Sequence, residues 1–144
     1  MLQDYIDEFR VFNRFYTAYI GILNKSFMNT KYSLPQARVL HAIYVNEGIT
    51  PTEIASALNM DKSYLSRILI TFEKKKLLGK KMSSTDGRVS HLYLTASGKK
   101  DFQAIDEASD KQVEKLLRQM SEAERKTVIE SMMKLKDTLS KYKL

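Results

Sequence analysis

The stretch TPTEIASALNMDKSYLSRILITFEKKKLLGKKMSSTDGRVSHLYL, residues 50–94, places two short helix patterns and a hairpin pattern in immediate succession. Thr50 is a suitable N-cap, a proline occupies the first helical position, and Glu53 completes a capping box. The pattern stops at Asn59, which tolerates the left-handed backbone of a tight turn, and Asp61 can cap a second helix. The sequence therefore predicts two helices joined by a short turn, as in a helix-turn-helix.

The second of these helices has an apolar face and a polar face. Its apolar residues recur at helical spacing and should point inward: Leu65, Ile68, Leu69 and Phe72. Short hydroxyls and one arginine face outward near its N-terminus, at Ser63, Ser66 and Arg67. Such residues can approach a DNA groove closely, donate to phosphates and make a bidentate contact to guanine. On a single helix, exposed polar residues are more often simply solvated, so this face alone does not decide the function.

A hairpin pattern follows the second helix. Leu77 and Leu78 are expected to end the helix at Gly79, and a basic strand, a turn containing an Asp-Gly pair and an alternating strand come next. Two leucines of the last strand share one face, Leu92 and Leu94. A hairpin placed directly after a recognition helix is a wing, and its tip residue Arg88 could enter a neighbouring minor groove.

At the tip of this wing, Asp86 precedes Arg88 by two residues. This spacing would let the carboxylate hold the guanidinium in one orientation across the turn, so Asp86 is predicted to orient the wing. The alternative is an ordinary exposed ion pair worth only about 0–1 kcal/mol.

Residues 50–98 resemble the DNA-binding core of the multiple antibiotic resistance regulator (MarR) family. The likeness is carried by MDKSYLSRIL in the second helix, by Asp-x-Arg in the wing, and by LTASG from Leu94 to Gly98. The resemblance implies a mainly α fold with a small β wing, in which a winged helix-turn-helix core joins N- and C-terminal helices that form a dimerisation lobe. It also implies that this Asp-x-Arg pair orients the wing.

The predicted site is a DNA-binding face. The residues expected to contact DNA are Lys62, Ser63, Tyr64, Ser66, Arg67, Lys74, Lys80, Lys81 and Arg88, with Asp86 as the wing-orienting residue. The positive charge is concentrated there. Residues 50–100 hold ten Lys/Arg and four Asp/Glu, a balance of +6 out of the chain's net +7. Such clustering is expected of a protein that neutralises phosphates, although a solvated basic face is the alternative.

The composition predicts one globular domain, residues 1–144, large enough for a core, with 43% apolar residues and a mean hydropathy of -0.37. No segment approaches the ~20 apolar residues of a membrane span, and MLQDYIDEFR lacks the layout of a secretory signal, so a cytoplasmic location is expected. The absence of cysteine excludes disulfides, thiolate metal sites, cysteine nucleophiles and cysteine-based peroxide sensing.

The termini are predicted to form the dimer. Residues 1–29 are predicted to form one long helix with two lines of apolar residues. One packing partner within a single small domain cannot cover both lines. Residues 1–30 and 100–144 are therefore assigned to dimerisation, and residues 31–99 to the winged lobe. Apolar helices at a chain terminus can also lie on a membrane, but the charges along this one favour a subunit interface.

The leading hypothesis is a homodimeric transcription regulator that binds a roughly palindromic operator in double-stranded DNA. The resemblance further implies a repressor released by a small aromatic or anionic effector. Five side chains could line such a cleft, although ordinary core and surface roles are favoured for them: Tyr16, Tyr19, Arg38, His41 and Tyr44. No catalytic constellation, metal-ligand spacing or cofactor motif is visible, so no enzyme activity and no cofactor are expected. The alternative function is a protein-interaction adaptor whose basic face binds an acidic partner.

Overall fold

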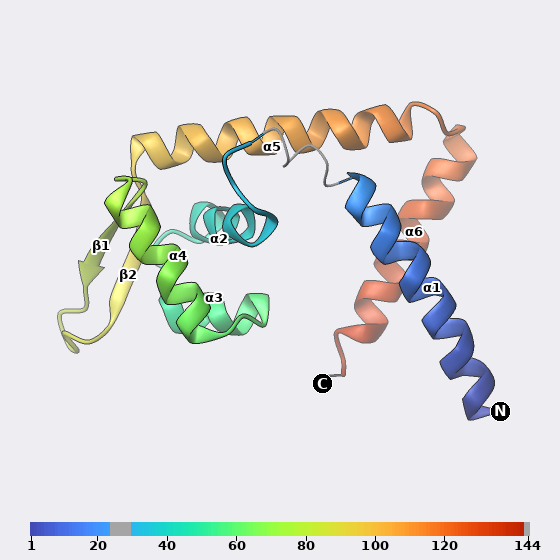
Figure 1. Ribbon diagram of the computed structural model, residues 1–144, viewed down its shortest axis with the longest axis horizontal. Coiled ribbons are helices and arrows are strands. Elements are labelled where there is room, and N and C mark those ends of the chain that lie inside the picture. The colour runs from blue at the N-terminus through green and yellow to red at the C-terminus, as the bar shows by residue number, and fades with distance from the viewer. Residues whose placement is uncertain (24–29, 143–144) are drawn as a thin grey trace. The chain divides into compact units, whose positions relative to one another are not determined.

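The computed structural model describes residues 1–23 and 30–142, and it is mainly helical with one small sheet (Figure 1). The elements, in chain order, are α1 (Leu2–Leu23), α2 (Leu34–Val45), α3 (Pro51–Leu58), α4 (Lys62–Lys74), β1 (Leu78–Met82), β2 (Ser90–Leu94), α5 (Ala96–Leu117) and α6 (Glu122–Leu139). This arrangement confirms the predicted fold class. The predicted first helix extended to residue 29, but residues 24–29 lie outside the described residues.

The chain divides into two compact units, Met1–Ser109 and Asp110–Leu144. The boundary falls inside α5, so this helix up to Ser109 belongs to the first unit and the rest of it to the second unit. In the described chain, no helix combines the length and the apolar character that a membrane crossing requires.

Local hydrogen bonds start the helices of the first unit where the sequence predicts. Ser33 and Thr50 cap α2 and α3, and each forms a complete capping box with the residue three positions later, Gln36 and Glu53. Asn59 ends α3 in the left-handed conformation, with φ 47°. Asp61 caps α4 by accepting a hydrogen bond from Tyr64 N–H. Asn59 and Asp61 thus fix both ends of the turn between α3 and α4, so the predicted helix-turn-helix is confirmed.

The end of α4 differs from the sequence prediction. The helix stops at Lys74, because Lys76 takes the left-handed backbone with φ 57°, and Leu77 N–H then donates to the carbonyl of Phe72 at 2.9 Å. The prediction that the helix ends at Gly79 is therefore wrong. Gly79 lies inside β1, where a Cβ would overlap the ring of Tyr93 across the sheet.

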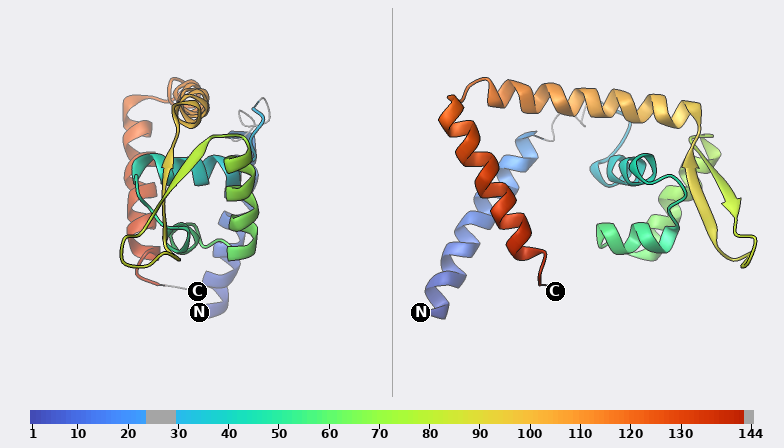
Figure 2. Two further views of the ribbon diagram at one scale, coloured as in Figure 1. Left: turned by 90° about the vertical axis from the view of Figure 1, so that its left-hand side faces the viewer. Right: turned by 180° about the vertical axis from the view of Figure 1, so that it is seen from behind.

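A single core holds α2, α3, α4 and the wing together. Four predicted residues of α4 are buried, Leu65, Ile68, Leu69 and Phe72, and they meet buried residues of α2, α3 and β2. Figure 2 shows these helices gathered on one side of the hairpin, whose tip extends away from them. Tyr44 of α2 is exposed, and its ring lies 4.5 Å from that of the buried Phe102.

Strand β2 is flanked on both sides. It pairs antiparallel with β1, with Leu78 opposite Leu94 and Lys80 opposite Leu92. On its other side the loop before α3 adds two backbone hydrogen bonds, from Gly48 N–H to Leu92 O at 2.7 Å and from Leu92 N–H to Ile49 O at 3.0 Å. The wing is thus joined by its backbone to the entrance of the helix-turn-helix.

The start of α5 is fastened to the end of α4. Thr95 accepts a hydrogen bond from Gly98 N–H at 3.1 Å, and its hydroxyl donates to Lys76 O at 2.7 Å. Gly98 is buried, and a Cβ there would overlap the carbonyl oxygen of Leu77. The Leu-Thr-x-x-Gly motif therefore supplies a core leucine, a helix cap and a close approach between backbones.

A polar cluster also ties α5 to the beginning of the winged lobe. The buried Tyr32 hydroxyl donates to the carboxylate of Asp101, which also pairs with Lys31 at 3.0 Å. Burial, then the hydrogen bond and the charge of Asp101, raise the pKa of Tyr32 well above its ordinary value. Burial alone would raise the pKa of Asp101, but the contacts with Tyr32 and Lys31 outweigh it and lower that pKa.

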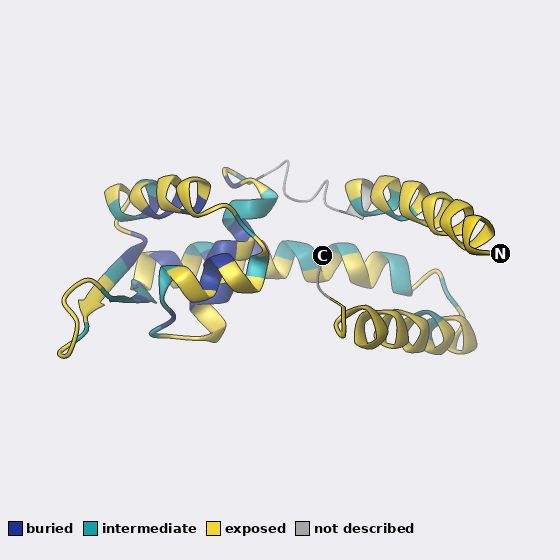
Figure 3. Ribbon diagram, turned by 90° about the horizontal axis from the view of Figure 1, so that it is seen from below, coloured by how far each residue is buried: buried dark blue, intermediate teal, exposed yellow. Residues whose placement is uncertain are grey.

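The terminal helices bury little within the single chain. The described residues of α1 include no buried side chain, and α6 has none either, as Figure 3 shows by colour. Ser121 nevertheless caps α6 through a complete capping box with Glu124, and the backbone and hydroxyl hydrogen bonds from Ser121 lower the pKa of that carboxyl. The sequence of α6 thus determines where the helix starts, while its long sides remain uncovered.

Candidate nucleic-acid interface

The outer face of α4 carries the predicted contact residues at its N-terminal end. The side chains of Lys62, Ser63, Ser66 and Arg67 are exposed and together line a shallow depression. Asp61 accepts a hydrogen bond from Tyr64 N–H at 2.9 Å, which fixes the first turn of this helix. The cationic and hydroxyl groups are thereby held on a rigid element, opposite the buried face.

Two further predicted residues of α4 are also exposed. The ring of Tyr64 is 40% exposed next to this depression, and Lys74 lies in the last turn of the helix. Within the part of the chain that the structure describes, neither side chain takes part in an ion pair or a ring contact. They are therefore available to a partner that approaches α4 from outside.

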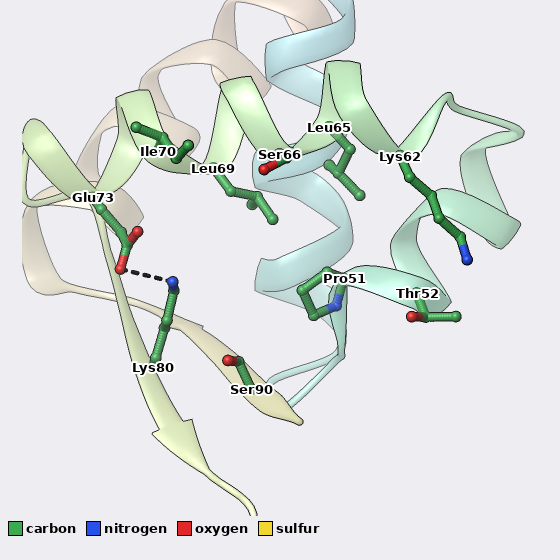
Figure 4. Close-up of a pocket in the computed structure, with 10 residues that line it drawn as sticks. All are labelled: Pro51, Thr52, Lys62, Leu65, Ser66, Leu69, Ile70, Glu73, Lys80 and Ser90. Carbon is green, nitrogen blue, oxygen red and sulfur yellow. Dashed lines mark ion pairs between the residues drawn. The ribbon is translucent and has the colours of Figure 1, made fainter. Parts of the chain in front are cut away.

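Lys80 lies in a different environment from the one that its sequence position suggested. Its ammonium pairs with the carboxylate of Glu73 at 3.1 Å, so the first strand of the wing is bridged to the last turns of α4 (Figure 4). Strand register places Lys80 on the same side as the buried Leu92. Sequence analysis assigned no role to Glu73. Because Glu73 and Lys80 lie seven positions apart with a helix end between them, no helical spacing rule could have paired them.

A groove lies between α4, the start of α3 and the wing. It has a volume of about 200 Å3, and its lining includes Pro51, Leu65, Leu69 and Ile70. Figure 4 shows Lys62 and Thr52 at one end of this groove and the Glu73–Lys80 pair at the other.

Lys81 points to the opposite side of the sheet from Lys80. Its ammonium lies 5.6 Å from the centre of the Tyr93 ring, which is a cation–π contact. The two neighbouring lysines of β1 therefore face different surroundings, one carboxylate and one aromatic ring, and they are not equivalent parts of a single basic patch.

The wing tip orders its backbone through Asp86. The Asp86 carboxylate accepts a hydrogen bond from Arg88 N–H at 3.0 Å, and Val89 N–H donates to Asp86 O at 3.0 Å. In the described chain no ion pair joins the side chains of Asp86 and Arg88, so the observed contact is with the backbone and not with the guanidinium. Seven residues, 83–89, connect the two strands, and Gly87 has no positive φ, so this is not a two-residue hairpin turn.

A second groove runs between α2 and α5 in the first unit. Two of the five candidate effector residues line it, Arg38 and His41, together with the ring of Phe102. Tyr16 and Tyr19 lie on α1 instead, where their rings stack on Phe12 and Phe15. In the described chain, no group of three or more His, Cys, Asp or Glu side chains could hold a metal ion.

Comparison with known proteins finds similarity to the family that the wing motif resembles. Residues 31–89, from the connector before α2 to the wing tip, match the family model described as MarR family. A curated relative, the putative transcriptional regulatory protein for hcr operon of Thauera aromatica, is 30% identical over 91 residues. These are 63% of this chain and 55% of the relative, so the chain matches only about half the length of that protein.

Solved structures agree over most of the chain. FabT of Streptococcus pneumoniae in complex with DNA has a TM-score of 0.80 and 21% identity, covering 94% of this chain and 99% of FabT. The S. aureus MepR–DNA complex has a TM-score of 0.74 and 22% identity, covering 88% of this chain and 97% of MepR. At these identities the likeness establishes the fold. The family model therefore marks residues 31–89 as similar to the MarR family, and the solved structures show the same fold over most of the chain.

Proposed function

We propose that the protein is a sequence-specific DNA-binding transcription regulator that acts as a homodimeric repressor. The observation that carries this proposal is the two-sided construction of α4. One face is locked into the core by Leu65 and Phe72, while the other presents Lys62, Ser66 and Arg67 to solvent on a capped helix. A rigid helix with short polar and cationic side chains can enter a major groove and place its arginine against a base edge.

The comparisons support the choice of ligand. FabT and MepR were each solved with DNA, and the Thauera relative is described as a putative transcriptional regulator. The concentration of positive charge in residues 50–100 is consistent with the same polyanion. The proposed contacts are the nine residues named above, with Arg67 reading bases and Arg88 entering the minor groove.

Dimerisation is proposed because the described residues of the terminal helices α1 and α6 include no buried side chain. On α1, Phe9 is 58% and Phe15 is 61% exposed, and α6 contains no buried residue over its 18 positions. Helices in proteins gain most of their stability from packing an apolar face, so a second copy is the partner that closed symmetry favours. Two winged lobes held by one dimer would address half-sites about one helical turn apart.

For effector control, the groove between α2 and α5 is the candidate site. Arg38 offers a cation for an anionic ligand, and the rings of His41 and Phe102, 5.8 Å apart, offer an aromatic surface. A repressor released by a small aromatic or anionic compound at this groove is the regulatory part of the proposal.

The proposal is tested by selecting duplexes that bind the protein from a random-sequence library and by footprinting the DNA that flanks its own gene. Arg67→Ala should weaken binding to the selected duplex by about 1–3 kcal/mol and leave thermal unfolding nearly unchanged. Lys111→Ala removes one positive charge from an exposed position of the second unit and serves as the control. An adaptor would show no salt-sensitive affinity for any duplex, and that result would exclude the proposed function.

A further inference from the structure

The groove between α4 and the wing combines two kinds of surface. Its floor is apolar, with Leu65 and Leu69 almost fully buried and Ile70 still 47% exposed. Its ends carry ammonium groups, Lys62 from the start of α4 and Lys80 from β1. An exposed isoleucine thus lies in a groove whose two ends carry cations, on the same lobe as the proposed DNA-contacting face.

The chemistry of the groove fits a sugar–phosphate backbone. A deoxyribose ring presents carbon atoms that can pack against Pro51 and Ile70, while its phosphate oxygens accept hydrogen bonds from ammonium and hydroxyl groups. Thr52, Ser66 and Ser90 supply hydroxyls around the same groove. A volume of about 200 Å3 falls below the roughly 300–1,000 Å3 typical of sites for drug-sized ligands, so a backbone segment is the better match.

Glu73 is the one acidic group that lines this groove. Its carboxylate lies 3.1 Å from the Lys80 ammonium, and both side chains are a little more than one third exposed. A carboxylate and a phosphate are alternative acceptors for the same ammonium. An ion pair this exposed contributes little to stability, so a phosphate can displace the carboxylate at small cost.

We infer that this groove binds a phosphodiester of the DNA backbone. The Glu73 carboxylate pairs with the Lys80 ammonium until the phosphate replaces it. The inference rests on the proposed DNA-binding function and adds a contact site together with an internal competitor. In the free protein, Glu73 holds the wing against α4 and masks one positive charge. In the complex, Lys80 exchanges its carboxylate partner for a phosphate.

The exchange makes opposite predictions for the two partners. Lys80→Met should weaken binding to a mixed-sequence duplex and lower the slope of log affinity against log salt by about one. Glu73→Gln frees Lys80 in advance, so binding should strengthen and the slope should steepen by up to about one. Lys80→Met should therefore cost more in the Glu73→Gln background than in the wild type, because no ion pair then has to be broken.

Glu47→Gln is the matched control, since it removes one exposed acidic charge from the same lobe outside the groove. A second variant, Ile70→Glu, keeps the Glu73–Lys80 pair and places a carboxylate on the floor of the groove. It should weaken binding more than Val45→Glu, which adds the same charge at an exposed position of α2. Circular dichroism confirms that each variant is folded.

The outcomes separate the two proposals. If wild-type protein shows no salt-dependent binding to any duplex, the proposed function fails. If wild-type protein binds but Lys80→Met leaves the salt slope unchanged in both the wild-type and the Glu73→Gln background, the proposed phosphate site is wrong. Equal effects of Glu73→Gln and Glu47→Gln would also overturn it, because they would reduce the role of Glu73 to its contribution to net charge.

Discussion

The helices of the winged lobe and the terminal helices both carry apolar residues at helical spacing. The lobe buries these residues, whereas the terminal helices leave them largely exposed. In α4, Leu65 is 2% and Phe72 is 0% exposed, whereas Phe9 and Phe15 of α1 are mostly exposed. The lobe therefore satisfies its apolar residues within one chain, and the terminal helices do not. This difference indicates that recognition and assembly depend on different surfaces, and that mutations can separate them.

The largest effect is expected from truncating the centre of the lobe. Phe72→Ala should lower the free energy of unfolding by about 3–5 kcal/mol, because it leaves a cavity among fully buried neighbours. The measurement is urea unfolding, with hydrogen exchange to locate the change. Phe9→Ala, the same substitution in α1, should leave exchange protection of the lobe unchanged. Equal losses of lobe protection in the two variants would break the comparison.

The second prediction concerns assembly. Phe9→Glu should weaken the dimer at least tenfold, since a buried phenylalanine contributes about 1.5–3 kcal/mol to an interface that covers it. Sedimentation at micromolar concentration measures the change. Asn13→Glu introduces the same charge at an exposed polar position of α1 and should have a smaller effect. Wild-type protein that sediments only as a monomer would refute the assignment of α1 to the dimer.

A third prediction addresses the junction between the lobe and α5. Asp101→Ala leaves the buried Tyr32 hydroxyl without its acceptor and should cost about 1–3 kcal/mol of unfolding free energy. Asp110→Ala, at an exposed position farther along α5, should cost much less.

The same carboxyl predicts a pH dependence. Because folding lowers the pKa of Asp101, its contribution is present above the unfolded-state pKa of about 3.9 and is lost as the pH falls through the folded-state value. Asp101→Asn should therefore flatten the acid side of the stability curve measured by urea midpoints. An acid limb as steep as that of the wild type would show that other carboxylates dominate.

The smallest effect on stability is expected at the wing tip. Arg88→Ala should lower the salt slope of DNA binding by about one, with less than about 0.5 kcal/mol lost in unfolding. Asp86→Ala should also weaken binding, although it removes a negative charge, because the Arg88 N–H loses its acceptor. Asp86→Asn retains an acceptor oxygen and should bind at least as well as the wild type. Tighter binding by Asp86→Ala at equal salt would contradict an orienting role.

Sequence patterns predicted what local chemistry determines. The predicted caps at Thr50 and Asp61 depend on residues at most three positions away, and the structure confirms both. Ser33 and Ser121 cap α2 and α6 through the same local spacing. The buried face of α4 follows from its periodicity in the same way. These elements could be predicted from the sequence because the groups that stabilise them are close in the chain.

Contacts between distant residues could not be predicted in this way. Tyr32 and Asp101 are separated by 69 positions, and Glu73 meets Lys80 only because the chain reverses at Lys76. No sequence pattern marks a left-handed conformation at a lysine, whereas a glycine is a common helix end, so the sequence predicts the end at Gly79 instead of Lys74. In the candidate site, the exposed face of α4 followed from the sequence, while the pairing of Lys80 and the backbone role of Asp86 required coordinates.

The two hydrogen bonds between residues 48–49 and Leu92 have a further consequence, for solubility. They cover one edge of β2 and β1 covers the other, so within the described sheet only the outer edge of β1 is open. An open edge can pair with a strand of another molecule, and charged residues, lysine above all, discourage such pairing. Lys80 and Lys81 lie in the middle of this edge strand. Replacing both by valine should therefore increase light scattering of concentrated protein in the absence of any DNA, so the two lysines would protect the protein from aggregation independently of any contact with phosphates.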